Sequence, residues 1–273
     1  MQSKQFDPNQ YSDNFKPGLL KSPYDKRDFK LKQYLPLGAI RIPDNYQSPE
    51  ISFIYNQENT SECCACAYSS LRYLQEVDQS GLTEAFSPTY TYGSREPMEV
   101  YEGMYIRNCL KKARSVGSIL YKELPGFYTV TQAMSLVNTK KADYLEKGNP
   151  FRITGFYVCR SRAEMQVGII TCKGIMTGIP IFDRMYNIGS DGLVPYDPNI
   201  DTQSNGGHCI LITGWKTENN KLYWRCLNSW GSEYGDHGYF WLPEEYPFME
   251  DAYTITDDII ETTFADYRKK HNY

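Results

Sequence analysis

The sequence predicts an α+β protein in which a mainly helical half precedes a mainly β half. Up to about residue 140, apolar residues recur at helical spacing. Beyond that point come short apolar runs typical of strands, namely F-R-I-T-G-F-Y-V, C-I-L-I-T-G-W, K-L-Y-W-R-C-L and G-Y-F-W-L. A chain of 273 residues is long enough for two such halves, and we expect a cleft where they meet.

The first 41 residues are polar and interrupted by prolines, as in D-P-N, K-P-G and K-S-P-Y-D. This composition predicts an extended strap that runs over a surface, not a domain of its own. We therefore divide the chain into a strap (1–41), a mainly helical domain (42–140) and a mainly β domain with a C-terminal tail (141–273).

Three helices are expected in the first half. The longest covers roughly residues 63–77, and Thr60 and Ser61 just ahead of it are suited to cap its first turn. The other two lie around Tyr90 and over residues 105–116, before a glycine. The apolar residues at helical spacing in the longest helix are Ala67, Leu71, Leu74 and Val77.

Composition and charge exclude several classes of protein. Hydrophobic residues make up 41% and charged residues 23%, which is typical of a folded chain. A net charge of −4 provides no broad basic surface, so we expect no nucleic-acid partner. The chain has neither an apolar run long enough to span a bilayer nor the apolar core of a signal peptide, so we expect no membrane partner.

The cysteines and histidines argue against a metal site. Among the eight cysteines there is no C-x-x-C pair of zinc type, and the three histidines, His208, His237 and His271, are scattered. The simplest interpretation is free thiols in a reducing compartment. We expect a cytoplasmic protein, or a virion-associated one if the source is a virus.

The segment G-G-H-C-I-L-I-T-G-W-K-T-E-N-N-K-L-Y-W-R-C-L-N-S-W-G predicts a β-hairpin, because two apolar strands flank the polar stretch K-T-E-N-N. If Trp215 faces Lys221, the loop covers residues 216–220, a common hairpin length. The same register places His208 opposite Asn228.

A histidine beside an asparagine has a chemical use. The side-chain oxygen of Asn228 is able to accept the Nδ1 hydrogen of His208, which would fix the tautomer and aim Nε2 outward as a base. A core histidine satisfied by a neighbouring amide explains the same pairing. Both interpretations stay open on these residues alone.

Three cysteines cluster at the predicted start of the first helix, in E-C-C-A-C-A. The partial positive charge and free N–H groups of a helix N-terminus stabilise a thiolate, and Cys63 lies nearest the expected cap. Cys64 and Cys66 point to other faces of the turn, and we interpret them as small buried side chains. Cys63 is therefore the candidate nucleophile.

Four segments together resemble the papain-like cysteine peptidases. Q-E-N-T-S-E-C-C-A-C-A resembles the active-site stretch, in which a glutamine stands six residues before the nucleophile. G-G-H-C-I-L-I-T-G-W and L-N-S-W-G-S-E-Y-G-D-H-G-Y-F-W-L resemble the histidine and asparagine segments, and E-G-M-Y-I-R-N-C-L-K-K-A-R-S-V-G resembles the stretch that holds the substrate. The pattern is most similar to bacterial, phage and viral members that lack a disulfide framework.

The resemblance implies a helical domain packed against a β-barrel-like antiparallel sheet domain, with the active-site cleft between them. It implies a cysteine endopeptidase that needs no cofactor and acts on peptides or proteins. Cys63 would then form the acyl-thioester, and His208 would act first as base and then as acid. Asn228 would orient the imidazole, and Gln57 would donate a hydrogen bond to the oxyanion.

The resemblance also implies which residues contact the substrate. Gly103 stands in the place of the glycine that pairs with the substrate backbone, and Met104 follows it. Cys209, directly after the histidine, is expected to border a specificity pocket. Trp230 is expected to shield the hydrogen bond between histidine and asparagine from water.

Glu62 departs from the family pattern, in which glycine or serine precedes the nucleophile. A carboxylate next to a thiolate should raise the pKa of the thiol and oppose its activation. In one interpretation Glu62 belongs to the first helical turn and points to solvent. In the other it moderates the thiol, or contacts the substrate and favours basic residues near the cleavage site.

The strap is expected to dock along the β domain or to cover part of the cleft. Covering would mean autoinhibition, and deletion of residues 1–38 should then change activity. Two other functions fit the same residues. One is an acyl transferase or isopeptidase, in which an amine replaces water, and the other is a catalytically inert papain-like structural or binding protein, such as a virion component.

Overall fold

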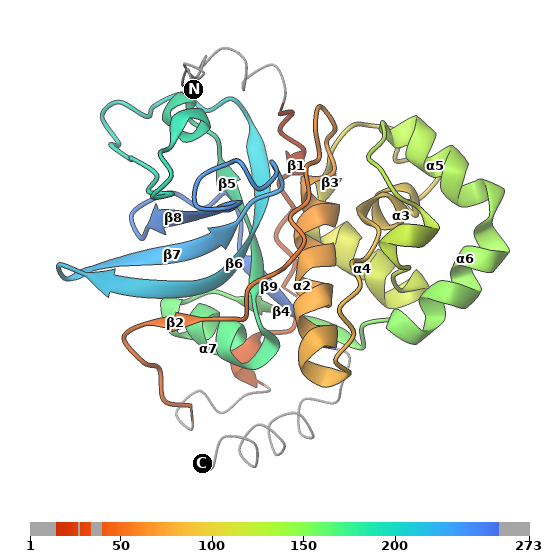
Figure 1. Cartoon of the computed structure of the whole chain (residues 1–273), viewed down its shortest axis with the longest axis horizontal. Helices are drawn as coiled ribbons and strands as arrows, with labels where there is room; N and C mark the ends of the chain where they lie inside the picture. Colours follow the sequence, from red (N-terminus) through yellow and green to blue (C-terminus); the bar gives the residue numbers. More distant parts are fainter. Residues whose placement is uncertain (1–14, 27, 34–39, 257–273) are drawn as a thin grey trace, which may run out of the picture.

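The structure, a computed structural model, describes residues 15–26, 28–33 and 40–256. Figure 1 shows the strands gathered on one side and most helices on the other, with one long helix, α2, along the boundary. The remainder of the predicted strap and the tail from residue 257 lie outside the described residues.

The helical half confirms the three helices expected from the sequence. The described α-helices are α2 (Cys63–Gln79), α3 (Pro88–Gly93), α4 (Ile106–Val116), α5 (Val130–Thr139), α6 (Lys141–Gly148) and α7 (Arg162–Cys172). Helix α4 ends at Gly117, where a φ of +74° favours glycine. Helix α7 lies within the β half, between two of its strands.

Helix α2 is the central element of the fold. Its residues from Cys63 to Glu76 are all buried, because the sheet lies on one side of it and helices α3 and α4 on the other. The expected caps are wrong: the N-cap residue is Glu62, and its side chain caps nothing. Thr60 instead uses its hydroxyl to donate to the carbonyl of Gln57 at 2.7 Å.

Most of the described strands form one sheet. The strands are β1 (Leu19–Leu20), β2 (Tyr46–Gln47), β3 (Met104–Tyr105), β4 (Gly155–Cys159), β5 (Ile175–Pro180), β6 (Gly207–Glu218), β7 (Lys221–Leu227), β8 (Tyr239–Pro243) and β9 (Ala252–Thr256). The order is β4-β9-β5-β6-β7-β8, with β2 added to β6, and the pairings within it are antiparallel. This order has two ends, so within the described residues the sheet is open, not a closed barrel.

The predicted hairpin is present, but its register is wrong. Glu218 faces Lys221, so the turn is the two residues Asn219 and Asn220, both with positive φ. A bulge between Ile212 and Gly214 then shifts the pairing by one residue. Amide side chains tolerate the left-handed conformation that such a short turn requires, a signal that the five-residue reading of K-T-E-N-N overlooked.

The core has a part on each face of the sheet. One cluster of buried side chains lies between the sheet and α7, and another joins α2 and α4 to the opposite face. Strand β2 pairs with β6, so residues 46–47 of the predicted helical domain lie on the sheet. Among the described residues, no helix combines the length and apolar character that crossing a membrane requires.

Candidate active site

The candidate nucleophile lies where the two halves meet. Cys63 is the first residue of α2, and its side chain is fully buried. The backbone N–H of Cys209, in β6, donates to the Cys63 sulfur at 3.5 Å. The start of the central helix is thus held directly against the strand that carries His208.

The candidate base is oriented by an amide, but through the other ring nitrogen from the one expected. His208 Nε2 lies 2.7 Å from Asn228 Oδ1, and because that oxygen only accepts, Nε2 carries the hydrogen. Asn228 Oδ1 is itself fixed by the Ser229 N–H at 2.8 Å. Nδ1 is therefore the nitrogen left to exchange a proton with Cys63.

Asn228 reaches His208 although the two residues do not face each other in the ladder. The last pair before the end of the ladder is Leu211 with Leu227, so Asn228 stands just beyond the paired region. Its backbone N–H donates to Gly238 O at 2.9 Å, outside the β6–β7 pairing. The contact follows from the chain leaving the sheet, not from the register that predicted it.

Trp230 packs against the histidine as expected. The Trp230 ring centroid lies 4.9 Å from that of His208. Tyr186 stacks on the Trp230 ring, with centroids 5.5 Å apart. The Trp230 side chain is only 3% exposed. This position allows the indole to keep water away from the hydrogen bond between His208 and Asn228.

The pKa of the Cys63 thiol is raised in this structure. Burial raises the pKa of the Cys63 thiol well above its usual value, and the adjacent Cys64 raises it further. Hydrogen bonding and charge from His208 act in the opposite direction. Burial is the larger effect, so the pKa of the Cys63 thiol stays above its usual value despite His208.

Gln57 is held as an oxyanion donor would be. Its side-chain oxygen accepts from the Ser229 hydroxyl at 2.6 Å, which directs the amide nitrogen the other way. That nitrogen donates to Thr60 O at 2.7 Å and to Lys16 O at 3.2 Å. Lys16 belongs to the strap, so a carbonyl group of the chain itself occupies the donor.

Residues 15–20, which we call the cleft segment, run through the space between the two halves. Phe15 stacks on Trp230 with ring centroids 4.9 Å apart and planes inclined by 17°. Leu19 packs against Gly178, where any Cβ atom would collide with its side chain. The strap therefore covers the candidate site, one of the two positions expected for it.

The cleft segment pairs with the stretch expected to hold the substrate, but not at Gly103. The Met104 N–H donates to Gly18 O at 2.8 Å, and β1 runs parallel to β3. Gly103 turns its own N–H to the Tyr92 hydroxyl at 3.1 Å. Gly103 has a φ of +87°, and a Cβ there would lie 2.6 Å from Gly18 O. The absence of a side chain at Gly103 therefore lets the cleft segment lie close to its backbone.

Two other residues expected to contact substrate are buried. Cys209 is 2% exposed beside the nucleophile while the strap is in place, and burial raises the pKa of its thiol to about 12; its place at a specificity pocket stays a prediction. Glu62 is fully buried, so it neither points to solvent nor faces a substrate. Cys64 and Cys66 are buried, as expected.

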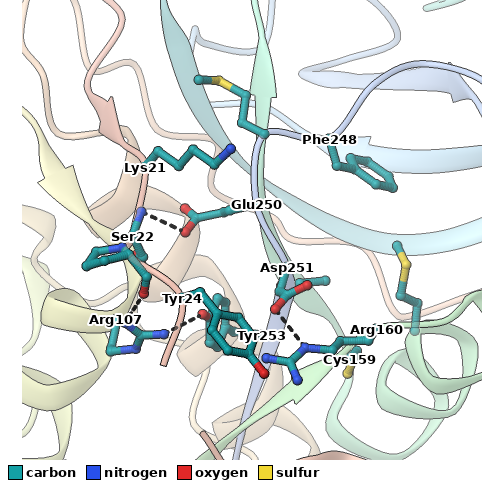
Figure 2. Close-up of a pocket in the computed structure, with 14 residues that line it drawn as sticks. Lys21, Ser22, Tyr24, Arg107, Cys159, Arg160, Phe248, Glu250, Asp251 and Tyr253 are labelled. Atoms are coloured by element: carbon teal, nitrogen blue, oxygen red, sulfur yellow. Dashed lines mark hydrogen bonds and ion pairs between the residues drawn. The ribbon is translucent and has the colours of Figure 1, made fainter. Parts of the chain in front are cut away.

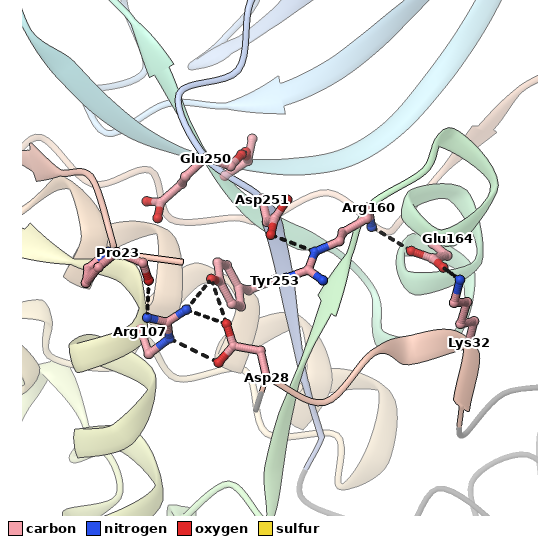
Figure 3. A network of polar contacts seen from close by, with 10 residues as sticks. Pro23, Asp28, Lys32, Arg107, Arg160, Glu164, Glu250, Asp251 and Tyr253 are labelled. Atoms are coloured by element: carbon pink, nitrogen blue, oxygen red, sulfur yellow. Dashed lines mark hydrogen bonds and ion pairs between the residues drawn. The ribbon is translucent and has the colours of Figure 1, made fainter. Parts of the chain in front are cut away.

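The strap is fastened by residues 28–33, which we call the anchor segment. Figure 3 shows Arg107, in α4, between the Pro23 carbonyl and the Asp28 carboxylate, with the Tyr253 hydroxyl beside them. The side chains of Arg107 and Asp28 are each 8% exposed. Leu31 is fully buried in the core between the sheet and α7.

Between the cleft and anchor segments, the strap crosses a cavity of about 450 Å³ (Figure 2). Ser22 N–H donates across it to Glu250 Oε2 at 3.1 Å. Tyr24 is 74% exposed and lies over the Arg160 guanidinium at 4.9 Å. This link is much less tightly held than the segments on either side of it.

Sequence reasoning missed three residues of the site. Ser229 fixes both Gln57 and Asn228, and its place in N-S-W was the available signal. Lys16 and Phe15 carry no local signal, because docking of an extended strap depends on distant surfaces. Within the described residues, no three His, Cys, Asp or Glu side chains are grouped so as to hold a metal ion.

Comparisons with known proteins agree with this geometry. A sequence model of the papain family cysteine proteases matches residues 126–258. Cathepsin B-like cysteine proteinase 4 from Caenorhabditis elegans is 26% identical over 128 residues, 46% of this chain and 37% of that protein. Cathepsin K from Mus musculus is 26% identical over 216 residues, 76% of this chain and 61% of that protein. The chain thus matches less than two thirds of the length of these relatives.

Solved structures share the fold. Xylellain, a cysteine protease from Xylella fastidiosa, superposes with a TM-score of 0.74 at 20% identity, covering 89% of this chain and 96% of that one. Procathepsin B S9 from Trypanosoma congolense superposes with a TM-score of 0.65 at 12% identity, covering 88% and 83%. These superpositions show that the chain has the fold of the papain-like cysteine proteases, and the family model matches its second half in sequence.

Proposed function

We propose that this protein is a cysteine peptidase that cleaves peptide bonds through an acyl-thioester on Cys63. The observation that carries the proposal is the alignment of three groups across the boundary between the halves. Cys63 starts the central helix, His208 lies beside it, and Asn228 Oδ1 holds the imidazole Nε2 at 2.7 Å. This is the arrangement that activates a thiol by proton transfer.

Each step can be assigned to an atom. The Cys63 proton passes to His208 Nδ1, and the sulfur bonds to the substrate carbonyl carbon. The carbonyl oxygen becomes negative and accepts from Gln57 Nε2. When the C–N bond breaks, the amine leaves with the proton from Nδ1. Water, deprotonated by the same nitrogen, then hydrolyses the thioester and frees the thiol.

Asn228 contributes by orientation. Its oxygen holds the hydrogen on Nε2 in every step, so the imidazole always presents Nδ1 to the sulfur. Trp230, which stacks with Tyr186 and packs on the imidazole, keeps that bond dry. An exposed hydrogen bond would exchange with water and let the ring rotate.

We also propose that the structure represents a latent state. Cys63, His208 and Gln57 are each 0% exposed while the cleft segment is in place. Lys16 O takes up the Gln57 donor that a substrate oxyanion would need. Catalysis therefore requires the cleft segment to leave.

The direction of the cleft segment explains why it would resist cleavage by the site it covers. A leaving amine must lie near His208 to receive its proton, so the C-terminal part of a substrate belongs on the side of Trp230. In the strap the order is inverted: Phe15 stacks on Trp230, whereas Gly18, after Lys16, pairs with Met104. The bond after Lys16 therefore has its amine on the wrong side for protonation.

The test uses the full-length chain with Phe15→Ala and Leu19→Ala together, which loosen the cleft segment and leave the anchor intact. An epoxysuccinyl peptide probe should modify Cys63, as mapped by mass spectrometry, and a peptide library should be hydrolysed. Adding Cys63→Ala or His208→Ala should abolish both signals. Deletion of residues 1–38 is a poor test, because it would remove Leu31 from the core.

Three outcomes would contradict the proposal. Modification of Cys64 or Cys66 alone would show that Cys63 is not the nucleophile. Labelling of Cys63 with amine-dependent ligation products in place of hydrolysis would favour the acyl transferase. An unlabelled and inactive variant that remains folded would favour the inert binding protein.

We further propose a reducing compartment for the protein. All eight cysteines lie within the described residues, and all are free and buried. Fractionation of cells that produce the chain should recover it among proteins with reduced thiols. Recovery with intramolecular disulfides would contradict this proposal.

A further inference from the structure

Glu62 occupies an unusual position for a charged side chain. It directly precedes Cys63, and its side chain is 0% exposed. The carboxyl group turns away from the cleft, toward Thr89 at the start of α3 and toward the loop 126–128. Glu62 thereby connects the start of α2 to two segments of the helical half.

The hydrogen bonds around Glu62 are best satisfied by a protonated carboxyl group. Tyr128 N–H donates to Oε1 at 2.8 Å. The Thr89 hydroxyl lies 3.1 Å from Oε2 and 2.7 Å from Gly126 O. Thr89 has a single hydroxyl hydrogen, and the nearer Gly126 carbonyl takes it. The remaining contact is then satisfied only if Oε2 donates to Thr89, which requires a proton on Glu62.

The surrounding charges leave this assignment intact. Burial raises the pKa of Glu62 to about 8, although the Tyr128 N–H lowers it, as would a Thr89 hydroxyl turned toward the carboxyl group. Arg95 lowers the pKa of Glu62 and Glu102 raises it, so these two charges act against each other. Cys66, on the other face of the turn, has its own pKa raised mainly by burial.

We propose that Glu62 is a positioning residue, which in its protonated form ties the first turn of α2, and with it Cys63, to Thr89 and to the loop 126–128. The neutral carboxyl group donates once and accepts once, so α2 starts at a fixed place relative to α3. The catalytic consequence rests on the proposed function of Cys63, whereas the hydrogen-bonding role does not.

Deprotonation of Glu62 would undo this arrangement. The Thr89 hydroxyl would have to turn from Gly126 toward the carboxylate, and a buried negative charge would lie at the N-cap of α2, where it raises the pKa of the Cys66 thiol. Because the folded-state pKa lies above the usual value of 4.5, the folded chain holds a proton that the unfolded chain releases. The stabilising contribution is complete below 4.5 and is lost as the pH rises through about 8.

The decisive variant is Glu62→Gln, because a neutral amide keeps an acceptor oxygen toward Tyr128 and a donor N–H toward Thr89 at every pH, with one additional N–H hydrogen. In the full-length chain, the thermal midpoint of the wild type should fall from about pH 5 to about pH 9 more steeply than that of Glu62→Gln. Infrared difference spectra should show a protonated carboxyl band that titrates near pH 8 and is missing in Glu62→Gln. Both readouts are independent of catalysis.

The reactivity of Cys63 provides the catalytic readout. At about pH 6 the two proteins should react with the epoxysuccinyl probe at rates within about twofold. At about pH 9, where ionised Glu62 exceeds the neutral form by about tenfold, Glu62→Gln should react up to about tenfold faster. Both proteins must open the strap before they react, so the opening equilibrium cancels in the ratio of their two labelling rates.

Glu76→Gln is the matched control, since Glu76 lies in the same helix but is ion-paired with Arg72. It should lose stability at all these pH values and leave the titrating carboxyl band in place. A Glu62→Gln variant that is less stable and less reactive than wild type at low pH would overturn the proposal, because the charge would then be needed. If the stability and infrared results hold but Cys63 is never labelled, the proposed function fails and the positioning role stands.

Discussion

The cleft segment and the anchor segment belong to one strap but are held by different physics. The cleft segment is bound as a ligand, through backbone hydrogen bonds to Met104 and Gln57 and through Leu19 in a hollow of the sheet. The anchor segment is bound as core, through a buried ion pair at Asp28 and the fully buried Leu31.

This difference indicates which part of the strap is able to leave without unfolding the protein. Everything that the cleft segment contacts would also serve a substrate, so its departure leaves usable surfaces behind. Departure of the anchor segment would leave a buried Arg107 without its carboxylate and a hole against α7. The sequence alone gives no sign of this boundary, because both segments are short and mix apolar with charged residues, F-K-P-G-L-L in one and D-F-K-L-K-Q in the other.

Asp28→Ala should have the largest effect on folding. It would leave the Arg107 guanidinium, which is 8% exposed, without its carboxylate, at a cost of about 3–5 kcal/mol in the free energy of unfolding. Urea unfolding followed by fluorescence measures the loss. A change confined to activity, with unfolding unaffected, would show that the anchor segment is no more structural than the cleft segment.

Leu31→Ala should come next. A fully buried leucine contributes its transfer free energy and fills a space that would otherwise be a cavity, so we expect a loss of about 3 kcal/mol. The same unfolding experiment measures it, and Leu31→Met, which keeps most of the volume, serves as control. Equal behaviour of the alanine and methionine variants would place Leu31 outside the core.

Leu19→Ala should affect access before stability. The leucine is 6% exposed, and its truncation removes about 2 kcal/mol of burial from the docked cleft segment. That loss corresponds to about a thirtyfold rise in the open fraction, and hence in the rate at which the epoxysuccinyl probe labels Cys63. No rise in labelling, with the protein folded, would mean that Leu19 does not hold the strap in the cleft.

Tyr24→Ala should have the smallest effect. The ring lies over Arg160 at an exposed position, where such contacts contribute about 0.5–1 kcal/mol or less. The free energy of unfolding should fall by about 1 kcal/mol at most, and the rate of probe labelling should change by about fivefold at most. A large effect on either would show that the link takes part in docking, and that the two segments are one unit.

Local sequence signals predicted the elements that carry the site, but not how they meet. Helical spacing predicted α2 with Cys63 at its start, and the apolar runs predicted β6 and β7. Their pairing was misjudged, because one bulge and a turn of two asparagines are small features with large effects on register. The contact between His208 and Asn228 survived only because Asn228 lies beyond the ladder.

Glu62 shows the limit of reasoning from neighbours in sequence. Its place beside Cys63 suggested interaction with the thiol or with solvent, yet its partners come from residues 89 and 128. Burial, which decides whether a carboxyl group is charged, depends on segments that pack together only in the folded chain. The choice of imidazole nitrogen on His208 is fixed by the same kind of long-range geometry.

The link between the two segments, in which Pro23, Tyr24 and Lys26 are exposed, makes the cleft segment a tethered inhibitor. While the tether is intact, the segment experiences an effective concentration of about millimolar around its own site, whatever the concentration of the protein. A single cut in the link would turn rebinding into a meeting of two molecules, and dilution would then oppose it. Inhibition would then depend on the concentration of the protein, and hydrolysis of one peptide bond in the link would be enough to make the opening permanent.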